Sequence, residues 1–172
     1  MFKYCPNCNS KQIIKTDLAR YDCPTCDYVF YHNTASAVAA IIRCEEAILF
    51  NVRSKEPARG MLDLPGGFVD YYERLEHALT REVEEELGIT LADWNYLSSY
   101  PNQYLYNGIV YHTCDAIFDT TLSDKPTITL QQTEVCDYCW IPIKEIDITK
   151  IGFKSMQNAV LEYINCKIFD AL

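Results

Sequence analysis

The chain has 172 residues, of which 49% are hydrophobic and 23% charged, as is ordinary for a globular protein with one core and a small appendage. No apolar stretch approaches the ~18 residues that a membrane span needs, and the start lacks the apolar run of a secretory signal. We therefore expect a cytoplasmic protein without a membrane partner. A net charge of -9 argues against coating of nucleic acid, but an acidic enzyme can handle anionic substrates through a divalent cation.

The N-terminal segment contains two Cys-x-x-Cys knuckles, Cys5/Cys8 and Cys23/Cys26, separated by fourteen residues. This spacing lets four thiolates surround Zn²⁺, which so short a segment needs because it cannot build its own core. Since all four ligands are cysteines, no position stays open for catalysis, and the pattern predicts a structural zinc ribbon over residues 1–33. The alternatives are redox-active thiols, which would need one pair in a thioredoxin-like context, and a rubredoxin-like iron site.

The remainder of the chain, residues 34–172, has the alternating strand and helix patterns that predict a layered domain. Strand-like runs are predicted at residues 37–43, 47–53, 61–64, 109–120 and 135–141. Helical periodicity is predicted at residues 73–87, with Gly88 as the stop, and at 155–169. Strands mixed with two helices favour an α/β or α+β domain.

The first of these helices carries an acidic cluster. Glu82, Glu85 and Glu86 fall within an arc of about 100° at roughly 100° per residue. Because like charges at this spacing repel, we expect a cation against them, and carboxylates suit Mg²⁺ that bridges to phosphates. Arg81 is placed to pair with Glu85 one turn on, and the glycine pair before the helix lets a metal or phosphate approach the backbone.

The complete spaced pattern resembles the signature of the Nudix hydrolase family. It reads Gly, five residues, Glu, seven residues, Arg-Glu, an aliphatic residue, any residue, Glu-Glu, any residue, Gly and an aliphatic residue, from Gly67 to Ile89, and every fixed position matches. The resemblance implies an α/β/α sandwich with a mixed sheet between helices. It also implies hydrolysis of a pyrophosphate bond in a nucleotide-linked small molecule.

The resemblance also implies roles for individual residues. The implied ligands of Mg²⁺ or Mn²⁺ are Glu82, Glu85, Glu86 and the carbonyl of Gly66 or Gly67. Arg81 would orient these glutamates, and Glu73 would brace the loop. The general base varies in the family, and here it would be a helix glutamate such as Glu82 or a distant acid, for which Glu134 is the candidate.

The substrate is predicted only as a class. A zinc ribbon before such a domain is similar to the NADH pyrophosphatase architecture, but the segment from Ser98 to Tyr106 lacks that subgroup's Ser-Gln-Pro-Trp-Pro-Phe-Pro motif. We favour a substrate such as ADP-ribose, with NADH or diadenosine polyphosphates as alternatives. Tyr100, Tyr104 and Arg53 are the candidate substrate-binding residues.

Two other functions stay open. A non-catalytic module that senses a nucleotide sugar usually has eroded glutamates, whereas these are intact. An enzyme acting on RNA caps would need the ribbon to bind RNA through its few basic residues. A homodimer is expected from the family resemblance.

Overall fold

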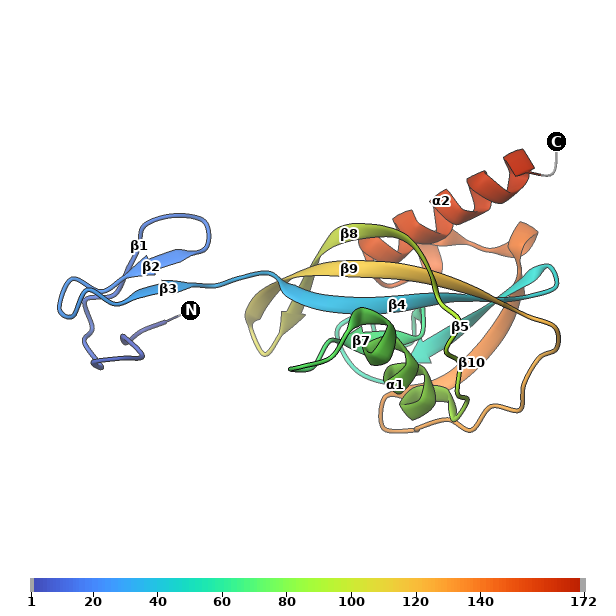
Figure 1. Ribbon diagram of the computed structural model, residues 1–172, viewed down its shortest axis with the longest axis horizontal. Coiled ribbons are helices and arrows are strands. Elements are labelled where there is room, and N and C mark those ends of the chain that lie inside the picture. Colours follow the sequence, from blue (N-terminus) through green and yellow to red (C-terminus); the bar gives the residue numbers. More distant parts are fainter. Residues whose placement is uncertain (1, 171–172) are drawn as a thin grey trace. The chain divides into compact units, whose positions relative to one another are not determined.

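The computed structural model describes residues 2–170 and the side chains of residues 2–166. It divides into two compact units after Thr34 (Figure 1). No helix in the described part of the chain is long and apolar enough to cross a membrane.

The N-terminal unit is a small antiparallel sheet of three short strands, β1 (Ile14–Lys15), β2 (Arg20–Asp22) and β3 (Val29–Tyr31), in that order. Its core is little more than three aromatic rings. The Phe2 ring centroid lies 4.7 Å from that of Phe30 and 5.6 Å from that of Tyr21. So small a core is consistent with a unit that needs a metal for stability.

The larger unit is built on one mixed sheet with the order β10-β5-β4-β9-β8. Its long strands are β4 (Ala35–Cys44), β5 (Ala47–Arg53), β8 (Asn95–Tyr106), β9 (Ile109–Leu122) and β10 (Val135–Pro142). β4 and β9 are parallel, and the other neighbours in this order are antiparallel. The sheet is therefore mixed, as the sequence predicts.

β4 and β5 separate soon after the turn that joins them. They pair only through Arg43 with Ile48 and Cys44 with Ala47. Farther on, β6 (Leu62–Asp63) pairs with β5, and β7 (Gly66–Phe68) pairs with β4. This separation places the segment before the first helix against the middle of the sheet.

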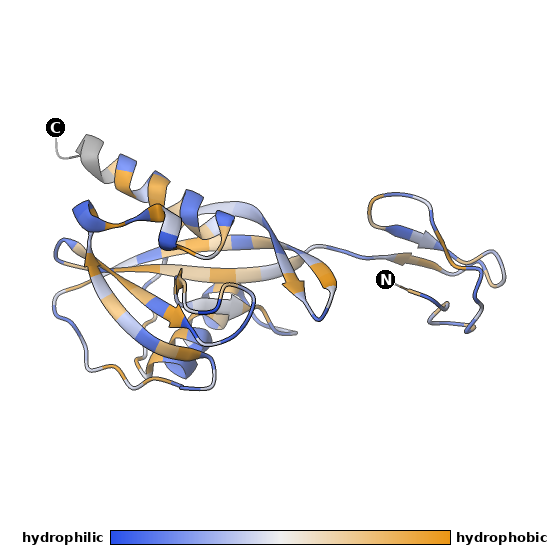
Figure 2. Ribbon diagram, turned by 180° about the vertical axis from the view of Figure 1, so that it is seen from behind, coloured by the Kyte–Doolittle hydropathy of each residue, from blue (hydrophilic) through white to orange (hydrophobic). Residues whose placement is uncertain are grey.

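The two helices cover opposite faces of this sheet, because alternate residues of β4 point to opposite sides. Val38, Ala40 and Ile42 pack in one core with the buried side of α1 (Leu75–Leu87). Ala39 and Ile41 pack in the other with α2 (Lys154–Asp170). Figure 2 shows the bands of hydrophobic residues in the strands that fill these two cores. The predicted α/β/α sandwich is confirmed. The 3₁₀ turns η1 (Ile143–Glu145) and η2 (Ile148–Lys150) connect β10 to α2.

Two differences from the predicted elements matter for the site. The first helix begins at Leu75 rather than residue 73, because the preceding Arg74 is extended (φ -84°, ψ 155°), which leaves Glu73 in the loop. β8 was not among the predicted strands. It contains Pro101 and few aliphatic residues, which an edge strand tolerates because one side of its backbone needs no partner.

Candidate active site

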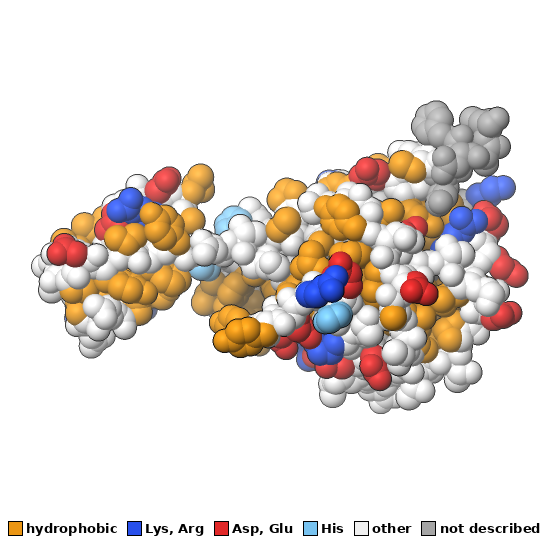
Figure 3. Space-filling view, viewed as in Figure 1, with side chains coloured by type: hydrophobic (Ala, Val, Ile, Leu, Met, Phe, Trp, Pro, Cys, Tyr) orange, Lys and Arg blue, Asp and Glu red, His pale blue; other side chains and the backbone are white. Residues whose placement is uncertain are grey.

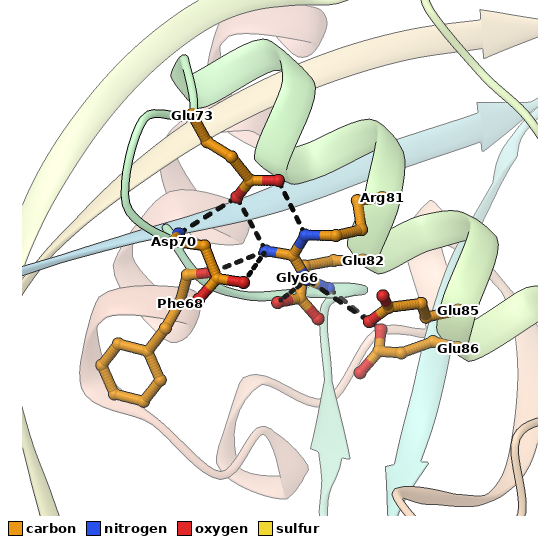
Figure 4. A network of polar contacts seen from close by, with 8 residues as sticks. All are labelled: Gly66, Phe68, Asp70, Glu73, Arg81, Glu82, Glu85 and Glu86. Carbon is orange, nitrogen blue, oxygen red and sulfur yellow. Dashed lines mark hydrogen bonds and ion pairs between the residues drawn. The ribbon is translucent and has the colours of Figure 1, made fainter.

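The acidic side of α1 is held against the sheet by its apolar side. Ala78, Leu79, Val83 and Leu87 are completely buried. Glu82, Glu85 and Glu86 leave the helix beside this buried row and lie near the loop that carries Gly66 (Figure 4). On the face of the larger unit that α1 covers, acidic and basic side chains are intermingled (Figure 3).

Arg81 connects the loop to the acidic cluster. Its guanidinium donates to both carboxylate oxygens of Glu73 at 2.8 and 2.9 Å and to the Phe68 carbonyl at 3.0 Å. It also donates to Glu82 at 2.9 Å and to Glu85 at 3.3 Å. The Arg81 hydrogen bonds hold the pKa of Glu73 at about 2. The predicted pair with Glu85 is therefore present, together with contacts to Glu73 and Glu82.

Glu86 is a buried carboxylate in acidic surroundings. It accepts hydrogen bonds from the Gly66 amide (3.0 Å) and the Asn51 side-chain amide (2.9 Å). Burial raises its pKa well above the ordinary value, and the charges of Asp63 and Glu82 add to the shift. Asn51 Oδ1 is buried without a hydrogen-bond partner in the described structure. A buried acid beside an orphaned acceptor oxygen fits a site that takes a cation with oxygen ligands.

Glu82 lies directly against Gly67. A Cβ added at Gly67 would come within 2.5 Å of the Glu82 carboxylate. Burial also raises the pKa of Glu82. The glycine therefore allows the helix carboxylate to lie against the loop backbone, where the Gly67 carbonyl is the predicted additional ligand.

Glu134 lies in the turn before β10, far from α1 in sequence. Its carboxylate is half exposed and pairs with Lys55 at 3.3 Å. Its charge nevertheless contributes to the raised pKa values of Glu82 and Glu86. The fold thus brings the predicted distant acid into the electrostatic neighbourhood of the helix glutamates.

A cavity adjoins the glycine loop on the side of β8, β9 and α2. Arg53, Tyr104, Gly66 and Gly67 are among its lining residues. Tyr100, the third predicted substrate contact, is not among them: it packs near α2 and donates a hydrogen bond to Glu162. The structure therefore brings two of the three predicted substrate-binding residues to the cavity.

Asn51, Asp63 and Asp115 are polar residues at this site that the sequence analysis did not identify. Each is at least nine-tenths buried. Asn51 interrupts the apolar run of β5. A polar residue inside a predicted buried strand was the available signal, since such residues need partners.

The four N-terminal cysteines form a cluster that could hold a metal ion. Their sulfur atoms all lie within 4.8 Å of one another. Cys5 and Cys26 are 3.8 Å apart, and Cys8 and Cys23 are 3.7 Å apart. Tetrahedral zinc with Zn–S bonds of ~2.3 Å separates its sulfurs by about 3.8 Å, so the geometry fits this ion. The Asn7 side-chain amide, at 3.5 Å, helps to lower the pKa of the Cys26 thiol to about 7.

Comparison with known proteins agrees with this geometry. A family model described as NUDIX domain matches residues 32–160. The chain is 30% identical over 166 residues to the NAD-capped RNA hydrolase NudC of Haemophilus influenzae strain PittGG, covering 93% of this chain and 60% of the relative. It is 41% identical over 81 residues to the ADP-ribose pyrophosphatase of Methanocaldococcus jannaschii, covering 46% of this chain and 44% of that protein.

Among solved structures, the fold is similar to a NUDIX hydrolase from Nitrosomonas europaea. The TM-score is 0.72 with 24% identity, over 95% of this chain and 91% of that one. The chain spans about 60% of the length of the NudC relatives that it matches over most of its own length. The match to the family model covers most of the chain, which therefore belongs to the Nudix hydrolase family.

Proposed function

We propose that this protein is a divalent-metal-dependent hydrolase that cleaves the pyrophosphate bond of a nucleoside diphosphate linked to another group, with ADP-ribose as the favoured substrate. The main support for this function is the acidic cluster on α1, whose carboxylates are held by hydrogen bonds and lie beside a cavity. Mg²⁺ or Mn²⁺ bound there would neutralise the diphosphate and lower the pKa of a water molecule.

We assign the remaining roles in the site to residues of the chain itself. Glu82, Glu85 and Glu86 supply carboxylate oxygens, and Gly67 a backbone carbonyl. Arg81 holds two of these carboxylates in fixed rotamers through its hydrogen bonds to Glu82 and Glu85. Such preorganisation reduces the reorganisation that the reaction requires.

Two carboxylates are candidates for the base that takes the proton of the attacking water. Burial raises the pKa of Glu82, which increases its affinity for a proton. Glu134 lies outside the motif, in the turn before β10, where it is half exposed and pairs with Lys55. The pH–rate profiles of Glu82→Gln and Glu134→Gln compare the two candidates, because loss of the base should remove the lower limb of the profile.

The substrate class rests on the cavity and the relatives together. Arg53 and Tyr104 offer a cation and an aromatic face next to the glycine loop. A relative named ADP-ribose pyrophosphatase and relatives named NAD-capped RNA hydrolase both supply precedents for adenosine-diphosphate compounds. We propose Zn²⁺ for the cysteine quartet, in a structural role.

The proposal is tested by phosphate-product analysis on a panel of ADP-ribose, NADH, diadenosine polyphosphates and nucleotide sugars, each with Mg²⁺ and with Mn²⁺. We expect cleavage of at least one compound only with metal, and its loss in the Glu85→Gln/Glu86→Gln double variant. An exposed matched variant, Glu45→Gln/Glu46→Gln in the β4–β5 turn, serves as the control. Tight binding of one compound without cleavage would instead favour a sensing module.

A further inference from the structure

The cavity beside Gly66 and Gly67 shares a wall with the acidic cluster. Gly66 and Gly67 touch Glu86 and Glu82 and also line the cavity. A diphosphate held at the carboxylates would therefore have this space next to it for one of its two substituents. The lining of the cavity should then show which chemical group enters it.

Aromatic rings form part of the cavity wall. Tyr104 of β8 and Phe153, next to α2, both line it, with ring centroids 5.8 Å apart and planes inclined by 32°. Phe68 meets Tyr104 edge-on at 5.9 Å. The Arg53 guanidinium lies 4.7 Å from the Phe153 centroid. Such walls suit a flat ring, which can stack on aromatic and guanidinium faces.

Asp115 of β9 is a buried acid in this lining that keeps accepting capacity. It is 2% exposed and lines the cavity. Thr113 donates to one carboxylate oxygen and Ser155 to the other, each at 2.6 Å. A carboxylate has about four lone-pair positions, so about two remain. Within the described residues, no Lys or Arg forms an ion pair with Asp115.

The second buried acid of the cavity is already paired. Asp63 receives a 2.6 Å hydrogen bond from Arg53 and a 3.0 Å bond from the Leu64 amide. Arg53 is fixed in turn by its bond to the Pro57 carbonyl at 2.9 Å. Asp63 and Asp115 each accept two hydrogen bonds, but Arg53 compensates the charge of Asp63. Asp63 therefore orients Arg53, and Asp115 is the buried carboxylate of the lining that has no ion-pair partner among the described residues.

We propose that the cavity binds the heteroaromatic end of the substrate and selects a ring with an exocyclic –NH₂ group, whose N–H donates to Asp115 while the ring stacks on Tyr104 or Phe153. This inference rests on the proposed function, because the diphosphate must lie at the glutamates. An adenine amino group and a nicotinamide carboxamide share this chemistry. An analogue with hydrogen or a carboxylate oxygen in place of the –NH₂ group has no such donor and is rejected.

The test compares two substrate pairs that differ at this group. ADP-ribose is compared with its purine-riboside analogue, which has hydrogen in place of the 6-NH₂ and no N1–H donor, and NAD⁺ is compared with nicotinic acid adenine dinucleotide. The wild type should favour the –NH₂ member of one pair in kcat/KM by roughly tenfold or more, as expected for a site built to hydrogen-bond its ligand. The responding pair identifies the ring that enters the cavity.

Asp115→Asn is the matching variant, because it keeps the shape of the side chain. Its amide oxygen still accepts from one hydroxyl, and its –NH₂ can donate to the other, so both partners stay satisfied. The variant should lose the preference or reverse it. Asp119→Asn, on the same strand but outside the cavity lining, should keep the wild-type ratio.

The outcomes distinguish this inference from the proposed function. Equal kcat/KM within both pairs for the wild type overturns it, even if Asp115→Asn does not fold. An equal loss on all four compounds in Asp115→Asn also overturns it. That loss is expected if Asp115 only holds α2 in place through its hydrogen bond from Ser155. If the wild type cleaves none of the four, the proposed function fails. Isothermal titration calorimetry of the same compounds then tests the inference by their affinities, and equal affinity within both pairs rejects it.

Discussion

Arg81 is the residue on which the geometry of the acidic cluster depends most. It donates to Glu73, Glu82 and Glu85 and to the Phe68 carbonyl, which a lysine ammonium cannot do from one position. We therefore expect Arg81→Lys to fold and to weaken metal activation or kcat roughly 10–100-fold, as loss of a ligand's supporting partner does. Titration of activity with Mn²⁺ measures both quantities.

Arg74 provides the control for this substitution. It lies just before the same helix, and its side chain is 71% exposed in a pair with Glu76. Arg74→Lys should leave the metal titration unchanged. Equal losses in the two variants would show that replacement of any arginine near α1 has this effect.

Glu86, which we propose as a metal ligand, should lower the stability of the fold when no metal is bound. Burial raises its folded-state pKa well above 4.5, so the folded state binds more protons than the unfolded state above that pH. Stability without metal should therefore decline as the pH rises above 4.5, and Glu86→Gln should lack this decline. The melting temperatures of the two proteins in EDTA, measured from pH 5 to about 9, test the prediction. A constant difference over this range would contradict it.

At the scale of elements, the close contact of β7 with α1 positions a carboxylate. A Cβ at Gly67 would meet the Glu82 carboxylate at 2.5 Å, and that flexible side chain can move aside. Gly67→Ala should therefore cost little stability but displace Glu82, with a loss in kcat of roughly 100-fold, the size expected from a misplacement of ~1 Å. Steady-state kinetics and thermal unfolding of the same sample measure both.

Gly108 in the β8–β9 turn supplies the converse case. Its φ of +75° disfavours a side chain, but no atom lies within 4 Å of an added Cβ. Gly108→Ala should lower the free energy of unfolding by about 1–2 kcal/mol while keeping kcat. If Gly108→Ala lost activity and Gly67→Ala did not, the assigned role of Gly67 would be wrong.

The elements also show how far the sequence predicts this structure. α1 and the central strands were predictable because their apolar residues follow the helical or strand period. The start of α1 was wrong by two residues, because the Glu73–Arg81 contact that holds the loop joins residues too distant for periodicity to show. β8 was missed because its packing against α2 comes from tertiary contacts rather than its own composition.

The site, like the fold, was predictable where its residues are close in sequence and not where tertiary contacts bring them together. The carboxylates of α1 share one short motif, so their side of the helix was predictable from spacing alone. Asn51, Asp63 and Asp115 come from three different strands, and only the sheet topology brings them near the cavity and Glu86. Tyr100 was predicted from residue type, and the fold directs it to α2 instead.

At the scale of the whole molecule, the two compact units should respond separately to loss of the metal that we propose for the four N-terminal cysteines. The short strands and three aromatic rings of the first unit bury little apolar area, whereas the second has two cores of its own. Cys23→Ser in the full chain should abolish amide protection in residues 2–34 and leave that of α1 and the sheet unchanged. Hydrogen exchange with mass spectrometry measures both units at once.

Cys166, exposed on α2, provides the matched substitution. Cys166→Ser should retain protection in both units. Loss of protection in the sheet of Cys23→Ser would show that the first unit stabilises the second.

The homodimer also stays a prediction, which sedimentation equilibrium can test.

The most direct test of the central claim is the rate at which ADP-ribose yields AMP and ribose 5-phosphate during titration with Mg²⁺ and Mn²⁺. We expect no products without metal, saturating activation with one of the two ions, and a loss of orders of magnitude in Glu86→Gln, whose fold is checked by its melting curve. Product formation in EDTA, or undiminished rates in folded Glu86→Gln, would contradict the assignment of the α1 carboxylates as the metal-dependent centre.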